Sequence, residues 1–392
     1  MATGPLDGMR VLDFTTTIAG PYCTRLMADL GAEVVKVEND EGDMMRSRPP
    51  MRDGASTSFG ALNAGKQSIV LDLKRPEAQE VVRRLLTTCD FLVENFRPGV
   101  MQRFGLDYES VSRRHQELIY CSISGYGQTG PSSGLAAYAP AIHAASGFDL
   151  AHMAYQPGRD RPDNCGIYIA DIVSGTYAFG AIMAALAHRH HTGLGQHIDV
   201  SMLETMLTLM GGEVQAAQFP VAPPGRPQFG PVRTADGFIM PAVASEKSFQ
   251  GTCQAAGHPE WITDPRFARY PDRRANWGEF VDLLETWSTT LPTAACQTAF
   301  DAAGVPASPY RTVKEVLGDP QLAHRGALAE VHDDGGMFKV VNPPFRLSAA
   351  PVQVARFAAS LGQHTREILE MAGYASEEIE KMSAAGIVGI EK

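Results

Sequence analysis

Short apolar runs alternate with amphipathic stretches along the first third of the chain. Apolar runs of four or five residues are typical of buried strands, and the longer stretches between them repeat at helical spacing. Alternation of strands with helices of this length predicts a Rossmann-like α/β fold with a parallel, doubly wound sheet. The predicted strands are Arg10–Phe14, Glu33–Val37, Ser68–Asp72, Phe91–Glu94 and Leu118–Ser122, and the predicted helices are Pro21–Leu30, closed by Gly31, and Pro76–Leu86.

The pattern changes near Phe219, where prolines and a glycine crowd a short stretch. This composition predicts a linker, and a smaller α+β unit follows it from Asp236 to about Ala307. We expect three segments: residues 1–218 as the first part of a large α/β domain, residues 219–311 as the linker and small α+β domain, and residues 312–392 as a return segment that completes the large domain and ends in helices at 365–372 and 376–384.

An acidic residue stands beside the most apolar helix of the chain. Asp171 follows the apolar run Ile167–Ala170 and heads a stretch from Ile172 that predicts one long buried helix. Because the positive end of a helix dipole stabilises a carboxylate, Asp171 is expected to stay ionised there even when half-buried. The residues alone leave two interpretations open, an ordinary helix N-cap and a nucleophile.

The composition of the 392 residues, 44% hydrophobic and 20% charged, is that of a globular protein with ample material for a core. The formal net charge of −10 argues against binding of nucleic acid or of an anionic membrane, because both need a basic face. The N-terminus lacks the features of a leader, and no apolar run is long enough to suggest a membrane span. We therefore expect a cytoplasmic protein.

Cysteines and histidines form no metal-binding pattern. The six cysteines include no CxxC pair, which indicates reduced thiols. His188, His190 and His191 end the long apolar helix, where they interact favourably with its dipole, and no carboxylate or cysteine completes a zinc site. We predict no metal.

A series of short motifs runs in order along nearly the whole chain. The motifs are Gly8–Phe14, Ala19–Thr24, Leu30–Glu38, Gly42–Asp43, Asn63–Lys66, Leu71–Lys74, Val93–Gly99, Ser124–Gly127, Gly130–Pro131, Thr192–Gln196, Ala303–Pro306, Glu315–Gln321 and Gly362–Thr365. In these segments the chain resembles the class III CoA-transferases, the family of formyl-CoA and carnitine CoA-transferases.

The resemblance implies that Asp171 is the nucleophile of an acyl-CoA:carboxylate CoA-transferase. Its carboxylate would attack an acyl-CoA thioester to give a mixed anhydride and CoA thiolate, which then forms an aspartyl-CoA thioester. An incoming acid would reverse these steps. The implied donor is succinyl-CoA-like and the acceptor is a small organic acid. Coenzyme A is then a substrate and product, and no permanently bound cofactor is expected.

The resemblance also implies a CoA site, assigned by matching motifs. Its residues are Leu71 and Lys74 at the adenine and phosphate end, Asn95, Phe96 and Arg103 beside them, Ala19 near the pantetheine, Tyr138 as an active-site tyrosine, Met202 at the acyl pocket and Gly225 as an N–H donor to the oxyanions. Two positions depart from the family pattern. Asn39–Glu41 replaces a basic residue, and Ala139 replaces the acidic residue after the tyrosine.

Two other functions stay open. α-Methylacyl-CoA racemases share this fold and the aspartate, but they add a His-Asp pair near the position of Tyr138–Ala139 to move a proton. The nearest histidine here is His143, and a lone histidine in an alanine-rich segment is more often structural. A non-catalytic CoA-binding protein is the third candidate.

Two further expectations concern the partners. A charged acceptor acid would need a basic residue near Asp171, and the unranked candidates are Arg46, Arg48, Arg159, Arg161 and Arg226. Members of the resembled family form interlocked dimers of ring-shaped subunits. Long connections around residues 200–235 and 305–330 would supply such a ring, so we expect an interlocked homodimer.

Overall fold

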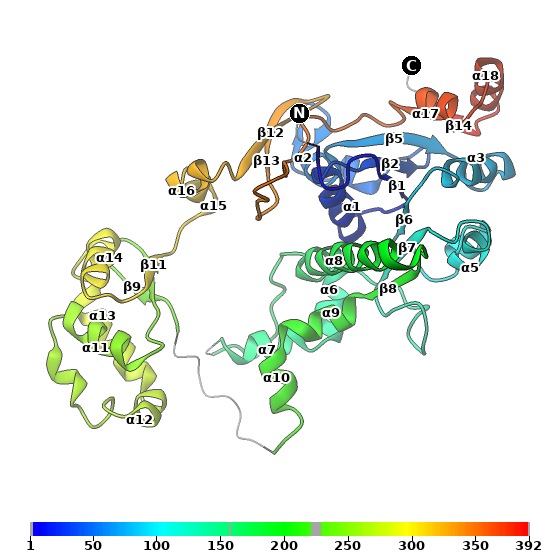
Figure 1. Ribbon diagram of the computed structural model, residues 1–392. Helices are drawn as coiled ribbons and strands as arrows, with labels where there is room; N and C mark the ends of the chain where they lie inside the picture. The colour runs from blue at the N-terminus through cyan, green and yellow to red at the C-terminus, as the bar shows by residue number, and fades with distance from the viewer. Residues whose placement is uncertain (1–2, 157, 221–228, 391–392) are drawn as a thin grey trace. The chain divides into compact units, whose positions relative to one another are not determined.

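The computed structural model describes residues 3–156, 158–220 and 229–390, which divide into two compact units (Figure 1). The larger unit takes in the chain up to residue 153, residues 160–211 and the chain from residue 323. The smaller unit takes in residues 154–159 and 212–322. The sequence-based domain boundaries at 218/219 and 311/312 stay a prediction.

A mainly parallel sheet organises the larger unit. Among the described residues it has seven strands in the order β14-β5-β2-β1-β6-β7-β8, and only β14 runs antiparallel to its neighbour. The parallel strands follow the strand order of the doubly wound dinucleotide-binding fold. The expected α/β class with a large parallel sheet is therefore confirmed. The strands are β1 Arg10–Asp13, β2 Glu33–Glu38, β5 Lys66–Leu71, β6 Phe91–Glu94, β7 Ile119–Ser124, β8 His197–Ser201 and β14 Val388–Gly389.

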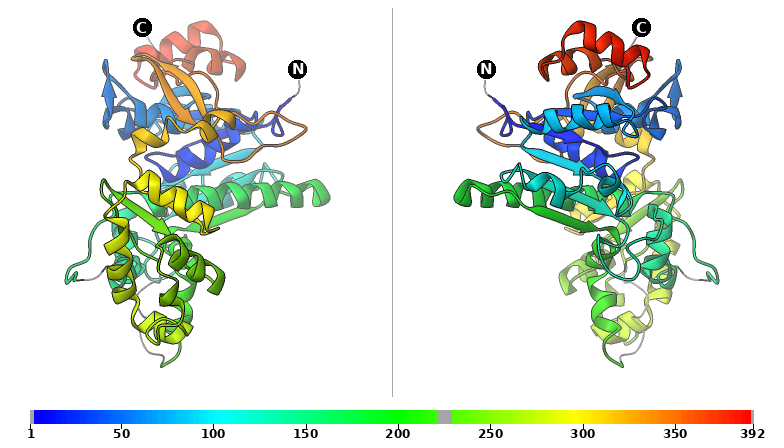
Figure 2. Two further views of the ribbon diagram at one scale, coloured as in Figure 1. Left: turned by 90° about the vertical axis from the view of Figure 1, so that its left-hand side faces the viewer. Right: turned by 90° about the vertical axis from the view of Figure 1, so that its right-hand side faces the viewer.

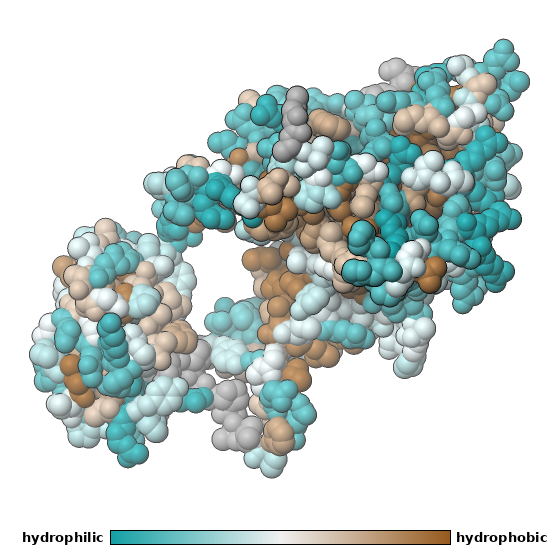
Figure 3. Space-filling view, in the orientation of Figure 1, coloured by the Kyte–Doolittle hydropathy of each residue, from teal (hydrophilic) through white to brown (hydrophobic). Residues whose placement is uncertain are grey.

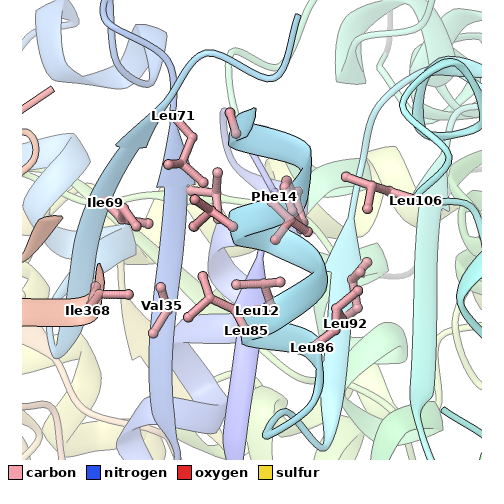
Figure 4. Packing of buried hydrophobic residues seen from close by; sticks show 14 of the residues in the cluster. Leu12, Phe14, Val35, Ile69, Leu71, Leu85, Leu86, Leu92, Leu106 and Ile368 are labelled. Carbon is pink, nitrogen blue, oxygen red and sulfur yellow. The ribbon is translucent and has the colours of Figure 1, made fainter. Parts of the chain in front are cut away.

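Different helices cover the two faces of this sheet, because successive strand residues point to opposite sides. Val11 packs in the core with α1 and α8, and Leu12 packs in the core with α3, α17 and α18. Figure 4 shows the second core, in which Leu85 and Leu86 of α3 lie over the strands. The helices are α1 Ala19–Asp29, α3 Pro76–Leu86, α8 Ile169–Thr192, α17 Thr365–Met371 and α18 Ser376–Ala384.

Helix α8, predicted as one long buried helix, is buried along one face. Ala178, Ile182 and Ala185 pack in the core that α8 shares with α1 and the sheet, whereas Tyr177 on another face is 50% exposed. Because α8 is apolar on several sides, it is also the one helix of the described segments that is long and apolar enough to cross a membrane, by length and composition. Figure 2 shows its length beside the strands.

Several predicted elements coincide with the observed ones, including α3, β6 and α18. Helix α1 starts two residues before the predicted Pro21. Proline fits the first turn of a helix, where the N–H groups have no partner within the helix, so it did not mark the first residue. Strand β5 starts at Lys66 rather than Ser68, because its pairing with β2 extends back to that residue.

The smaller unit is α+β, as expected. Among the described residues, a short antiparallel sheet in the order β11-β10-β9 packs with α11, α13 and α14 around a core that contains Phe249, Phe280 and Phe300. Its elements are β9 Val232–Arg233, β10 Phe238–Pro241, α11 Glu246–Ala255, α12 Tyr270–Ala275, α13 Trp277–Ser288, α14 Thr293–Ala302 and β11 Ala307–Pro309. Short helices α10 Gly211–Ala216, α15 Val313–Val316 and α16 Pro320–His324 lie near the changes of unit.

The remaining elements of the larger unit are short. They are β3 Met51–Arg52, β4 Ala55–Ser56, α2 Thr57–Asn63, α4 Val100–Arg103, α5 Tyr108–Ser112, α6 Ala139–Ala145, α7 Phe148–Ala154, α9 Met202–Leu209, β12 Leu328–Asp333 and β13 Gly336–Val341. Strand β14 extends the sheet beyond β5, so the chain from residue 323 returns to the larger unit.

Candidate active site

The strand order creates a crevice at the carboxyl ends of the central strands β1 and β6. The connections from β1 and β6, which are neighbours, lead to opposite directions along the sheet. In doubly wound sheets, ligands bind outside the carboxyl ends of the strands at this switch point. Residues Thr15–Thr17 follow β1 and Asn95–Pro98 follow β6, so both connections lie at the crevice.

A pocket of about 240 Å³ opens at this switch point. The ends of β1, β6 and β7 form part of its wall, and the first turn of α8 adds Asp171. All the described residues that line it lie in the segments up to 153 and within 160–211, which belong to the larger unit. The lining residues are Thr16, Thr17, Ala19, Met44, Asn95–Pro98, Ile123–Gly125, Ser133, Leu135, Ala137, Tyr138, Asp171 and Met202.

Asp171 is the third residue of α8, not its cap. The helix begins at Ile169 after exposed Ile167 and Tyr168, which pair with no strand of the sheet. The first two residues of the apolar run Ile167–Ala170 therefore lie on the surface, and its last two begin the helix. Asp171 still lies in the first turn, where the helix dipole favours a negative charge.

A histidine caps this end of α8. The backbone N–H of Ala170 donates to Nε2 of His143 at 3.1 Å, and the imidazole is almost completely buried. Burial lowers the pKa of His143, so the ring is neutral and its basic nitrogen is occupied by the helix. His143 thus has a structural contact here, and this geometry disfavours its use as a racemase base.

The Asp171 carboxyl is enclosed and has no hydrogen bond or ion pair within the described part of the chain. Asp171 is 9% exposed, and burial raises the pKa of its carboxyl to about 6. At neutral pH the group is therefore mostly ionised, yet it has few solvent contacts. A carboxylate with this environment and an open pocket beside it can attack an electrophilic carbon.

A second pocket of about 280 Å³ adjoins the first along the same edge of the sheet. The two pockets share Thr16 and Phe96 in their linings, and the second extends to Leu71 and Lys74 at the end of β5. Together they form a path along the carboxyl ends of the strands. Such a path suits an elongated ligand with one end at Asp171 and the other at Lys74.

The structure brings most of the predicted site residues to this path. Ala19, Asn95, Phe96, Tyr138 and Met202 line the Asp171 pocket, and Leu71, Lys74 and Phe96 line the adjoining one. Arg103 is exposed at the end of α4 and lines neither pocket, although its neighbour Phe104 does. Gly225 lies outside the described residues. The binding roles of these residues stay predictions.

Arg97 was missed by the sequence reasoning, although the motif Val93–Gly99 contains it. Of the residues that the structure describes, it is the one basic residue in the lining of the Asp171 pocket, and it forms no ion pair with any of the others. Arg46, in contrast, pairs with Glu38 at 2.7 Å and stacks on Phe59. Arg48, Arg159 and Arg161 line neither pocket, and Arg226 lies outside the described residues.

No group of three or more histidine, cysteine, aspartate or glutamate residues that could hold a metal ion occurs in the part of the chain that the structure describes. His188, His190 and His191 lie at the end of α8, as expected.

Comparison with known proteins identifies the family. The family model for CoA-transferase family III matches residues 6–365. The chain is 36% identical to succinate–glutarate CoA-transferase of Agrobacterium fabrum, over 93% of this chain and 95% of that one. It is also 36% identical to succinyl-CoA–D-citramalate CoA-transferase of Chloroflexus aurantiacus, over 98% of each chain.

A solved structure agrees with this relationship. A CAIB/BAIF family protein from Brucella suis superimposes with a TM-score of 0.83 at 32% identity, covering 95% of this chain and all of that one. Similarity in both sequence and fold extends over nearly the full length. The chain therefore belongs to CoA-transferase family III and is an enzyme of the CoA-transferase class.

Proposed function

We propose that this enzyme transfers coenzyme A from a succinyl-CoA-like donor to a small organic acid, with Asp171 as the nucleophile. The observation that carries this proposal is the enclosed Asp171 carboxyl, without a partner among the described residues, at one end of two adjoining pockets. Burial without a compensating cation leaves the carboxylate poorly solvated. This environment suits a nucleophile better than a carboxylate that stabilises the fold through an ion pair.

The transfer proceeds through covalent steps on Asp171. One carboxylate oxygen attacks the thioester carbon, the C–S bond breaks, and CoA leaves as the thiolate from a mixed anhydride. The thiolate then attacks the aspartyl carbon of the anhydride, which releases the donor acid and leaves an aspartyl-CoA thioester. An acceptor carboxylate repeats these two steps in reverse, so Asp171 is regenerated without an external energy source.

Coenzyme A is a substrate and product in this scheme, and no resident cofactor or metal takes part. Its adenine and phosphate end would lie near Leu71 and Lys74, with Arg103 as a further cation, because phosphates bind well to basic side chains. Its thiol end would reach Asp171 past Thr16 and Phe96, which line both pockets. The Gly225 amide remains the predicted donor to the oxyanion.

Arg97 is the residue that we assign to the second carboxylate of the acid. The relatives from Agrobacterium and Chloroflexus carry names of dicarboxylic acids, and a dicarboxylate needs a cation for the group that does not react. Arginine binds carboxylates with two parallel hydrogen bonds. The position of Arg97 in the lining, without an ion pair in the described residues, supports a preference for dicarboxylic substrates.

We also propose a cytoplasmic, interlocked homodimer. Exposed apolar side chains on α8 and α9 support an interface there, because soluble monomers seldom expose large apolar patches. Tyr177, Leu207 and Leu209 are each more than 40% exposed, and apolar residues gather in this region in Figure 3. A monomeric mass in light scattering would refute the dimer.

Isotope exchange tests the proposed function. Labelled succinate is incubated with the enzyme and unlabelled succinyl-CoA in the absence of any other acid. The covalent mechanism predicts that label enters succinyl-CoA, because the half-reaction is complete without an acceptor. Absence of exchange, together with deuterium uptake at the α-carbon of a 2-methylacyl-CoA, would instead establish racemisation.

A further inference from the structure

We propose that Asn95 and the Lys36–Asp43 ion pair are positioning residues, which hold the loop Thr15–Thr17 in a strained conformation that forms one wall of the Asp171 pocket. This loop joins β1 to α1, and Thr16 and Thr17 line the pocket. The inference rests on the proposed function, because it concerns the same pocket.

The strain lies at Thr17. Its φ of +70° is in the left-handed region, which a β-branched residue adopts only against a steric penalty. Asp53, in the turn between β3 and β4, is the other non-glycine residue with a positive φ in the described segments. Asp53 lines neither pocket, so among the described non-glycine residues only Thr17 combines a positive φ with a position at the candidate active site.

Asn95 holds the loop from the side of β6. The N–H of Thr16 donates to Oδ1 of Asn95 at 2.8 Å, and Nδ2 of Asn95 donates to the Thr16 carbonyl, also at 2.8 Å. The side-chain amide thus pairs with one residue as a neighbouring strand would. It joins the connections that follow β1 and β6, which are the two sides of the switch point.

A buried ion pair holds the loop from the side of β2. Nζ of Lys36 lies 3.0 Å from Oδ2 of Asp43 and donates to the Thr15 carbonyl at 2.6 Å. Oδ1 of Asp43 accepts the N–H of Thr17 at 3.2 Å. Lys36 is 1% exposed and Asp43 is 3% exposed, so neither charge can turn to water.

Three consecutive loop residues are therefore each held by a polar group from another part of the chain. A buried ion pair contributes little net stability compared with apolar residues of the same size, because both charges lose their hydration. The strained backbone and the buried charges both lower the free energy of unfolding, so stability of the fold does not explain them. Their meeting beside Asp171 indicates that the loop geometry serves the reaction, where small displacements of the substrate lower the rate strongly.

Two glycine variants separate this role from a structural one. Thr17→Gly and Asp53→Gly both relieve a positive φ, so both should retain or raise the melting temperature. Only Thr17→Gly should let the loop that forms the pocket wall move. We expect its kcat to fall by at least about tenfold, with little change in KM for the acyl-CoA. Asp53→Gly should keep the wild-type kcat.

Asn95→Ala provides a second variant, since it removes both hydrogen bonds to Thr16. If Asn95 positions the loop, its loss should lower kcat. If its side chain contacts CoA directly, its loss should raise KM for the acyl-CoA instead. Rates of covalent labelling of Asp171 by succinyl-CoA are measured in parallel. Normal kcat and labelling rate in both Thr17→Gly and Asn95→Ala would overturn the inference. Absence of labelling in the wild type would instead refute the proposed function.

Discussion

Gly175 of α8 lies directly against the backbone of Ala19 at the start of α1. A Cβ atom added at Gly175 would come within 2.5 Å of the Ala19 carbonyl oxygen, which is closer than real Cβ contacts. The glycine therefore lets the second turn of α8 approach the start of α1. Asp171 lies one turn before Gly175, so this contact also helps to set where the carboxylate meets the pocket.

Gly175→Ala should lower both stability and activity. We expect the free energy of unfolding to fall by about 1–3 kcal/mol, the usual cost of overpacking, and kcat to fall because the first turn of α8 must shift. Gly180→Ala is the matched control in the same helix, since an added Cβ there meets nothing within 4 Å. It should stabilise the protein by up to about 1 kcal/mol. Equal effects of the two variants in urea unfolding would contradict this interpretation.

The pH dependence of the first half-reaction should follow the ionisation of Asp171. Burial raises the pKa of this carboxyl to about 6, and only the ionised form attacks a thioester. Well below pH 6, kcat/KM for the acyl-CoA should therefore fall about tenfold per pH unit. The measurement is a pH profile from 4.5 to 8 in a protein verified as folded at each pH. A flat profile down to pH 4.5 would count against Asp171.

Asp171→Asn should stabilise the protein at neutral pH. Burial raises the pKa of this carboxyl in the folded state above its ordinary value, so the wild type carries the penalty of a buried charge above about pH 6 and loses it below about pH 4. A rise of the pKa from its ordinary value to about 6 corresponds to a loss of about 3 kcal/mol in the free energy of unfolding at pH 7. The variant should therefore unfold at a higher temperature at pH 7, with the difference gone at pH 4.

Asp7→Asn is the control for that experiment, because Asp7 is exposed. It should change the melting temperature at neither pH. If Asp171→Asn destabilised the protein at pH 7, the carboxylate would have a stabilising partner and the view of an unpaired nucleophile would be wrong.

Arg97→Ala should change the choice of acid. Loss of the guanidinium should raise KM for dicarboxylic acceptors by at least about tenfold, as expected for the loss of a charge-assisted contact, and leave monocarboxylic acceptors unaffected. Arg48→Ala provides the control, since Arg48 is exposed and lines neither pocket. A parallel loss for mono- and dicarboxylates would mean that Arg97 serves coenzyme A or the fold instead.

The regular elements around the sheet were predictable because local signals and tertiary packing agree there. Helix α3 starts at Pro76 and turns Val81, Val82 and Leu85 to the core, and its observed bounds are the predicted ones. The start of α8 was not predictable in this way. Its cap comes from His143, which is 27 residues away from Ala170, so no neighbouring residue signals it.

The candidate site was predictable in its members but not in their contacts. Motif similarity pointed to Asn95 as a CoA ligand, whereas its side-chain amide is bound to Thr16. Arg97 stands in the same motif, and only the shape of the pocket distinguishes it from an ordinary surface arginine. Contacts between residues far apart in the sequence leave no periodic pattern, so they required the fold.

Covalent labelling shows whether Asp171 forms a bond to its substrate. The enzyme is incubated with succinyl-CoA, treated with borohydride and digested, and the peptide that contains Asp171 is weighed against the same peptide of Asp171→Asn. The account predicts that the wild-type peptide loses the mass of one carboxyl oxygen and gains two hydrogens, as reduction of an aspartyl thioester to an alcohol requires, and that the variant peptide is unchanged. An unmodified Asp171 peptide during active turnover would contradict it.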